Sequence, residues 1–242
     1  MGYREFAPPT MLRDLVECAW VVDGPPAPVR VLPDGCMDLI RMNGRIVVAG
    51  PDTTASVTPR DGEAFVGLRF RPGILPRLLG VPAHEVRNDR VPLTDLRSMP
   101  SRDRSLVGLA SELASERPRA ETAPWSLPML SQVTDSLAAG STVADVAAEV
   151  GWSRRTLQRQ CTAVYGYGPA VLRRILRFRN AVQLLNDGHS YADVAARAGY
   201  ADQPHLHREV RGLAGAPLAS LRQDANGANR STQLPSGSAT VA

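Results

Sequence analysis

The spacing of hydrophobic residues changes along the chain and divides it into a strand-like first part and a helical second part. Up to residue 97, short runs rich in β-branched residues are separated by Pro and Gly clusters such as Gly24-Pro25-Pro26, which is typical of strands joined by turns. From residue 127 to residue 223, hydrophobic residues recur every three or four positions, as they do on one face of a helix. We therefore predict an α+β chain with two domains.

The first domain, residues 1–97, is predicted to be mixed and mainly β. Its strongest signal is a hairpin over residues 38–49, because Asn43-Gly44 at the centre readily adopts the positive φ angles of a tight two-residue turn. A further strand is expected over 65–70, and a short helix over 74–79 should follow it.

The region between the two parts, residues 98–126, is rich in Ser, Arg, Glu, Ala and Pro. We expect a linker here that carries a packing helix over 103–117, because its leucines share one helical face. The helical domain is predicted to span 127–223. Residues 224–242 have no apolar periodicity, and we expect them to be a disordered tail.

One helical unit occurs twice in the second part. The segment TVADVAAEVGW at 142–152 is echoed by SYADVAARAGY at 190–200. Each copy begins with a hydroxyl residue and has Asp three positions later, so we expect a capping box in both. In each copy the helix ends at a Gly that permits a left-handed turn. A second helix follows this turn, and it is anchored by Leu157 in the first copy and by Leu206 in the second. This is the pattern of a helix-turn-helix, whose second helix enters the major groove of DNA.

A long helix is expected between the two copies, from about Ala170 to Asp187, with Pro169 just before it and Gly188 at its end. A helix of roughly 18 residues is ~27 Å long. Successive major-groove faces on one side of B-DNA lie ~34 Å apart. One chain carrying both copies is therefore predicted to reach two adjacent turns of double-stranded DNA.

The charge of the chain agrees with a DNA partner in the second part only. All 28 basic residues are Arg, and the formal net charge is +4. Residues 125–223 hold 11 Arg against 7 Asp and Glu, whereas the rest of the chain holds 17 of each. The chain is too balanced in charge to coat DNA as a histone does. No apolar run is long enough to cross a membrane, so we predict no membrane partner and a cytoplasmic location, nucleoid-associated when the chain is bound to DNA.

These residues resemble the AraC/XylS family of bacterial transcription regulators. The resemblance covers about 130–222 and rests on VAAEVGWS at 146–153 and AARAGYADQ at 195–203, with a departure at Cys161 and Val210, where the family usually has Phe. A thinner resemblance in the first part rests on LPDGCMDL at 32–39 and RFRPG at 69–73. In the wider family the first domain senses an effector or dimerises. The resemblance therefore implies a sequence-specific regulator that works with RNA polymerase indirectly, and it leaves a small-molecule effector and a homodimer open.

Candidate DNA contacts lie on the second helix of each unit, where Arg can pair with guanine and Gln with adenine. They are Arg154, Arg155, Gln158 and Arg159 in the first unit and Gln203, His205, His207 and Arg208 in the second. Weaker candidates, for the DNA backbone, are Ser153, Arg173, Arg174 and Arg177. For all of these side chains, the alternative is a solvated charged face.

Other kinds of site have little support in the sequence. Three cysteines at wide spacing, without a CxxC motif, exclude a disulfide framework and a zinc ribbon. The segment 33–38 could suggest a metal or thiol site around Cys36, but we interpret it as a Pro-Asp-Gly turn. We predict no catalytic residues, metal or cofactor, since His84 is the one His of the first part. The alternative function is an enzyme or redox sensor in the first part, with the helical part directing it to DNA.

Overall fold

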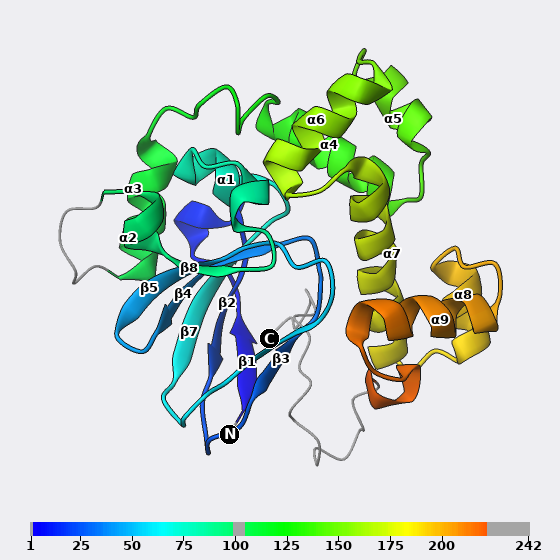
Figure 1. Ribbon diagram of the computed structural model, residues 1–242, viewed down its shortest axis with the longest axis horizontal. Helices are drawn as coiled ribbons and strands as arrows, with labels where there is room; N and C mark the ends of the chain where they lie inside the picture. Colours follow the sequence, from blue (N-terminus) through cyan, green and yellow to red (C-terminus); the bar gives the residue numbers. More distant parts are fainter. Residues whose placement is uncertain (1, 99–104, 222–242) are drawn as a thin grey trace.

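The computed structural model describes residues 2–98 and 105–221, and it confirms a β-rich first domain followed by a helical one (Figure 1). The strands are β1 (Tyr3–Phe6), β2 (Val16–Val22), β3 (Val29–Val31), β4 (Met37–Met42), β5 (Arg45–Ala49), β6 (Ser56–Thr58), β7 (Phe65–Phe70) and β8 (Arg90–Pro92). The helices are α1 (Ile74–Leu79), α2 (Leu93–Leu96), α3 (Leu106–Ser115), α4 (Leu127–Ala138), α5 (Val143–Glu149), α6 (Arg154–Tyr165), α7 (Pro169–Asn186), α8 (Tyr191–Arg197) and α9 (Gln203–Ala214). Short 3₁₀ turns are η1 (Thr10–Leu12), η2 (Ala83–Val86) and η3 (Leu218–Leu221).

The first domain is built on a six-stranded antiparallel sheet in the order β1-β2-β7-β4-β5-β8, beside a two-stranded ribbon of β3 and β6. Strands β4 and β5 are the predicted hairpin, and their turn has Asn43 at φ 50° and Gly44 at φ 67°. The predicted strand 65–70 is β7 and the predicted short helix 74–79 is α1. These elements were predictable because each depends on residues close together in the sequence.

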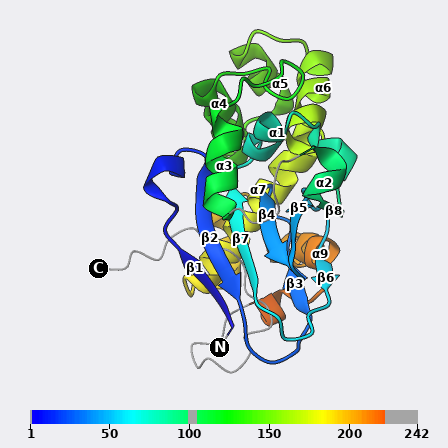
Figure 2. The same ribbon diagram turned by 90° about the vertical axis from the view of Figure 1, so that its left-hand side faces the viewer.

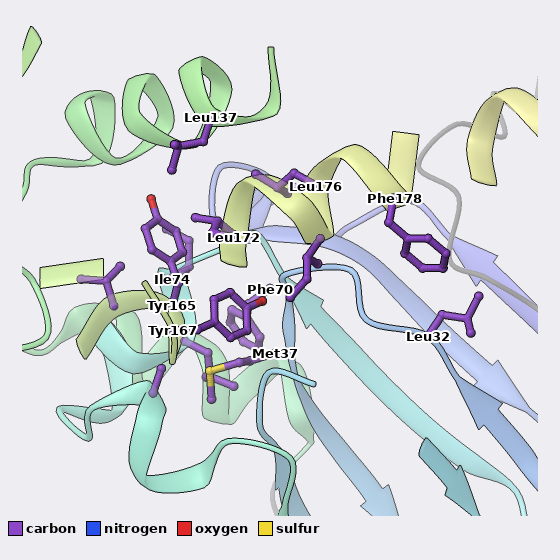
Figure 3. Close-up of a cluster of buried hydrophobic side chains, with 14 of the residues drawn as sticks. Leu32, Met37, Phe70, Ile74, Leu137, Tyr165, Tyr167, Leu172, Leu176 and Phe178 are labelled. Carbon is purple, nitrogen blue, oxygen red and sulfur yellow. The ribbon is translucent and has the colours of Figure 1, made fainter. Parts of the chain in front are cut away.

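The two faces of the six-stranded sheet have different surroundings. Leu39, Leu68 and Phe70 are on the face that packs into the main hydrophobic core, which also contains side chains from the helical domain (Figure 3). Trp20 and Phe65 belong to a second, smaller cluster. The sheet is therefore buried against the helices on one face and forms a separate apolar site on the other.

Helix α3 begins at Leu106, after Ser105, whose side chain accepts a hydrogen bond from the amide of Gly108. The predicted start at residue 103 lies outside the described residues, and the helix ends at Ser115, two residues before the predicted end. Helix α3 contacts α1, β4 and β7. It is therefore the packing helix that the sequence predicted within the linker, and it packs on the first domain. The predicted tail, 224–242, also lies outside the described residues.

The repeat forms two similar pairs of helices, α5 with α6 and α8 with α9. Gly151 at φ 68° and Gly199 at φ 74° make the turns, as the sequence predicted. The capping box is complete at α5. At α8, Ser190 accepts the amide of Asp193 and so caps the helix as predicted, and its hydroxyl donates to the Asp193 carboxylate at 2.6 Å, as the hydroxyl of Thr142 donates to Asp145 at 2.7 Å.

Helix α7 joins the two pairs and begins and ends one residue before the predicted bounds. Its apolar side chains are buried along its length, and the helix contacts α4, α6, α8 and α9. The fully or almost fully buried residues on it include Leu172, Ile175, Phe178, Ala181, Val182 and Leu185. Helix α7 therefore contributes buried side chains to the packing of both helix pairs.

The first domain packs against α7 as well. A Cβ on Gly35, which has φ 86°, would lie 3.4 Å from Cδ2 of Leu176 and 3.5 Å from Cδ1 of Leu172, so the turn before β4 rests on this helix. Beside it, Arg179 of α7 forms an ion pair with Glu17 of β2. Figure 3 shows side chains of the sheet and of α7 in the same cluster.

Each helix-turn-helix unit also contacts the first domain directly. The guanidinium of Arg87 donates to the carbonyl of Gly166 at the end of α6 at 3.1 Å. In the second unit, the amide of Ala55 donates to the carbonyl of Leu213 in α9 at 2.7 Å. Figure 2 shows α9 behind the ribbon of β3 and β6. The first domain therefore contacts α7 and both units at once.

The contact at Gly166 can be tested by substitution. This Gly has φ 84°, and a Cβ there would lie 2.5 Å from Cγ of Pro51. Gly151 has φ 68°, but in the described part of the chain no heavy atom lies within 4 Å of its Cβ position. We expect Gly151→Ala to cost ~1 kcal/mol from backbone strain alone. Gly166→Ala should cost clearly more, because the domain contact must also move.

Urea unfolding of the two variants and the parent chain measures this difference. Equal losses of unfolding free energy in the two variants would contradict the described packing between Gly166 and Pro51.

Candidate nucleic-acid interface

Helix α6 exposes its first two turns and buries the rest. Leu157 and Cys161 are completely buried on the inner face. The second half of the helix packs against η2 and α1 of the first domain. Arg154, Arg155 and Arg159 are exposed. The free part of α6 is therefore its N-terminal part, which is the part that contacts base edges in helix-turn-helix complexes.

Two neighbouring candidates on α6 differ in their placement. Arg159 lies two residues after the buried Leu157 and so is nearly opposite the buried face. Gln158 is exposed, but its carboxamide folds towards the start of α7: a Cβ on Gly168 would lie 2.2 Å from its Nε2. In this arrangement Arg159 extends outward, whereas Gln158 covers a glycine of its own domain.

Helix α9 repeats this geometry. Arg208 is exposed and follows the buried Leu206 by two residues, as Arg159 follows Leu157. Gln203, at the first position of α9, is exposed too. The two second helices thus present an Arg at the same position of the outward face.

The two histidines of α9 are only half-exposed and contact their own domain. Nδ1 of His205 accepts the amide of Ala201 at 3.3 Å, and its ring lies edge-on to Tyr200 with centroids 5.4 Å apart. The ring of His207 is edge-on to Tyr191 at the same centroid distance, 5.4 Å. These contacts give both histidines a role in packing the second unit.

The arginines of α7 are held by neighbouring groups. Nε of Arg174 donates to Glu209 of α9 at 2.7 Å, and Arg177 donates to the same carboxylate at 3.4 Å. Burial tends to raise the pKa of Glu209, but the hydrogen bond and charge of Arg174 and the charge of Arg177 hold it below its usual value. Arg173 reaches the carbonyl of Ser141 at 3.4 Å. These three arginines, which the sequence suggested as contacts of the DNA backbone, therefore also connect α7 to neighbouring parts of the protein.

Ser153, a weaker candidate, caps α6: its Oγ accepts the amide of Thr156 at 3.1 Å. Arg211 is exposed one turn after Arg208 on the same side of α9 and was not among the predicted residues. Its position three residues after a predicted contact was the available signal.

The segment 33–38 forms a turn, as the sequence favoured. Oδ1 of Asp34 accepts the amide of Cys36 at 2.8 Å, and Gly35 between them has φ 86°. Within residues 2–98 and 105–221, no group of three His, Cys, Asp or Glu side chains is arranged to hold a metal ion. The two carboxylates of the segment face Arg69 instead, at 3.2 Å from Asp34 and 3.2 Å from Asp38. That partner lies far away in the sequence, and the sequence did not predict it.

Two separate parts of the chain match known protein families. Residues 134–224 match a family described as "Helix-turn-helix domain", and residues 4–92 match a "Domain of unknown function (DUF6597)". No curated protein matches the chain.

Among solved structures, the C-terminal domain of AraT, a response regulator from Geobacillus stearothermophilus, is 18% identical, with 42% of this chain and 92% of that chain covered and a TM-score of 0.37. ToxT from Vibrio cholerae O395 is 13% identical over 80% of this chain and 86% of that chain, with a TM-score of 0.43. A second ToxT structure, bound to (E)-4-(8-methylnaphthalen-1-yl)but-3-enoic acid, is 10% identical over 91% and 98% of the two chains, with a TM-score of 0.48.

The matched helix-turn-helix domain, with its two exposed second helices, defines a DNA-binding transcription regulator. Both helix pairs lie in the part of the chain that matches the helix-turn-helix domain, and the part that matches DUF6597 precedes it. In the described part of the chain, no helix is long and apolar enough to cross a membrane.

The described cysteines are poorly placed for redox sensing. Cys18, Cys36 and Cys161 are all buried and free. Burial raises the pKa of Cys18 and of Cys161 to about 12. Burial and the nearby carboxylates of Asp34 and Glu17 raise the pKa of the Cys36 thiol well above its usual value. A thiol that is both buried and protonated reacts slowly.

We therefore expect iodoacetamide to modify the native chain slowly at neutral pH and to modify all three thiols rapidly in urea. Mass spectrometry of peptides from the two reactions measures this difference for each cysteine. Rapid modification of Cys36 in the native chain would favour the redox-sensor alternative.

Proposed function

We propose that the chain reads a two-part DNA site, with α6 in one major groove and α9 in the next. The observation that supports this most directly is the matching placement of Arg159 and Arg208 on the outward faces of two similarly built helices. A guanidinium at such a position can donate two hydrogen bonds to O6 and N7 of guanine. The neighbouring exposed residues, Arg154 and Arg155 in α6 and Gln203 in α9, would add base or phosphate contacts.

The separation of the two readers is set by α7. This helix has 18 residues, which corresponds to ~27 Å. Its buried side chains and the contacts of Arg174 and Arg177 with Glu209 oppose bending between the units. A fixed separation of this size suits two half-sites about one helical turn apart.

We also propose that the first domain controls DNA binding through its contacts with both units. Arg87 contacts the end of α6, and Ala55 contacts α9. An event that shifts the first domain would therefore alter how one unit is placed relative to the other. An effector would act in this way if it bound the two arrangements with different affinities.

If Arg159 and Arg208 each read bases in a different half-site, substitution of one should relax the sequence preference in its own half-site and leave the other unchanged. We expect Arg159→Ala to weaken binding to the selected site by about 1–3 kcal/mol and to relax the preference in one half-site only. Arg208→Ala should do the same in the other half-site. Arg45→Ala is the control, because Arg45 is exposed at the start of β5 in the first domain.

Selection of bound sequences from a random DNA pool, with the full chain and each variant, measures these preferences. If either substitution weakened binding equally on all DNA sequences, that Arg would be a phosphate contact and the base-reading role would be wrong.

The rigid spacer predicts that the distance between the half-sites matters. Insertion of about 5 base pairs between them turns one half-site to the opposite face of the duplex. We expect affinity to fall to that of a single half-site, and a further 5 base pairs should not restore it, since α7 cannot lengthen. Titration of the three duplexes by fluorescence anisotropy measures this, and full affinity with the longest spacing would contradict a rigid connection.

A further inference from the structure

A cavity of about 60 Å³ lies on the side of the six-stranded sheet that is not packed against the helices. Its lining comes from all six strands of the sheet and from the ribbon of β3 and β6. The apolar part is formed by side chains that include Trp20, Val22, Val29, Ile40, Met42 and Phe65. Gly67 lies under the Trp20 indole, because a Cβ there would be 2.3 Å from two of its ring atoms. The sheet thus gives the cavity a flat aromatic wall.

One end of the cavity is charged: Asp38, Arg69 and Arg90 line it there, and Arg30 lines the cavity from the ribbon. Arg69 is 4% exposed and faces three carboxylates: Glu5 at 3.4 Å, and Asp34 and Asp38 each at 3.2 Å. Arg90, also in the lining, is already paired with Asp52 at 2.6 Å. The cluster around Arg69 therefore carries excess negative charge in a site of low polarity.

Asp38 has an oxygen that the protein leaves without a partner. Its Oδ2 accepts Nε1 of Trp20 at 3.2 Å and NH2 of Arg69 at 3.2 Å. Its Oδ1 is buried, and no donor in the described part of the chain reaches it. Burial raises the pKa of Asp38 to about 6, and the charge of Arg69 opposes this rise. A buried acceptor without a donor is costly, and a donor supplied by a ligand would remove that cost.

We propose that this cavity binds a small apolar molecule that carries a protonated amine. Its ammonium group donates to Oδ1 of Asp38 and offsets the excess carboxylate charge, while its apolar body lies against Trp20 and Phe65. Aromatic faces also attract cations. A carboxylate ligand is disfavoured, because it would add a further negative charge beside Asp38 and its neighbours.

The site is connected to the second DNA-reading unit. Arg30, at the centre of β3, lines the cavity and donates to the carbonyl of Ala214 at the end of α9 at 3.1 Å. Thr58 of β6 lines it too, and Ala55, just before β6, contacts Leu213. A ligand that moves the ribbon therefore moves the contacts of α9. This step rests on the proposed function, whereas the binding site itself does not.

Three probes of similar size and different charge test the site on the full chain at neutral pH: benzylammonium, benzyl alcohol and benzoate. Isothermal titration calorimetry gives the affinity of each. We expect benzylammonium to bind at least about tenfold more tightly than benzyl alcohol, and benzoate to bind most weakly. Benzoate binding as tightly as benzylammonium, or no binding of benzylammonium, would overturn the proposal.

Two variants place the binding in the cavity. Asp38→Asn should remove the advantage of benzylammonium over benzyl alcohol, and its fold is checked by circular dichroism because Asp38 also contacts Arg69. Met42→Trp should fill the cavity and weaken both probes without changing the charged cluster. Val66→Trp is the matched control, since Val66 is 41% exposed and does not line the cavity.

Unchanged benzylammonium affinity in Met42→Trp would mean that the ion binds elsewhere, which contradicts the proposal. DNA affinity of the ligand-free chain is measured in parallel. If benzylammonium fails to bind while the two-part DNA preference is present, the ligand site is wrong and the proposed function stands. If benzylammonium binds but the chain has no DNA preference, the proposed function is wrong and the ligand site stands.

Discussion

The packing of helix α7 on two sides is the constraint on which the rest of the structure depends. One side carries the cores of both helix-turn-helix units, and Leu172 and Leu176 also meet the turn at Gly35 of the first domain. Replacement of a fully buried Leu by Ala costs about 2–5 kcal/mol, which is a large share of the ~5–15 kcal/mol that stabilises a typical domain. The Arg179–Glu17 pair contributes less than its Coulomb attraction suggests, because its side chains are only 28% and 10% exposed and their desolvation offsets much of that attraction. Apolar burial therefore sets the relative position of the domains, and the ion pair adds to its specificity.

The same packing determines which parts of the two reading helices are exposed. The second half of α6 is covered by η2 and α1, and the end of α9 is held by the ribbon through Leu213 and Ala214. The first part of α6 is left to approach DNA, and α9 is exposed on its outward side as far as Arg211. The first domain thus contacts both second helices on the side away from their exposed parts, and its ribbon contacts the end of α9 directly.

Local signals in the sequence predicted most of the elements and much of the candidate interface. The Asn43-Gly44 turn, β7, α1 and the repeated capped helices depend on residues within a few positions of one another, and all were found. The contact between Arg179 and Glu17 joins residues 162 positions apart, and no periodicity reports such a pair. The same applies to Arg69 and its carboxylates, and to Gln158, whose placement depends on the backbone at Gly168.

In the proposed mode of binding, one chain reads two adjacent turns of DNA. Hydroxyl-radical footprinting of the full chain on a selected site tests it most directly, when the mass of the same complex is measured by native mass spectrometry. We expect one chain per duplex, with two protected patches on one face of the DNA about one helical turn apart. A single patch per chain, with two chains needed to protect both half-sites, would contradict it.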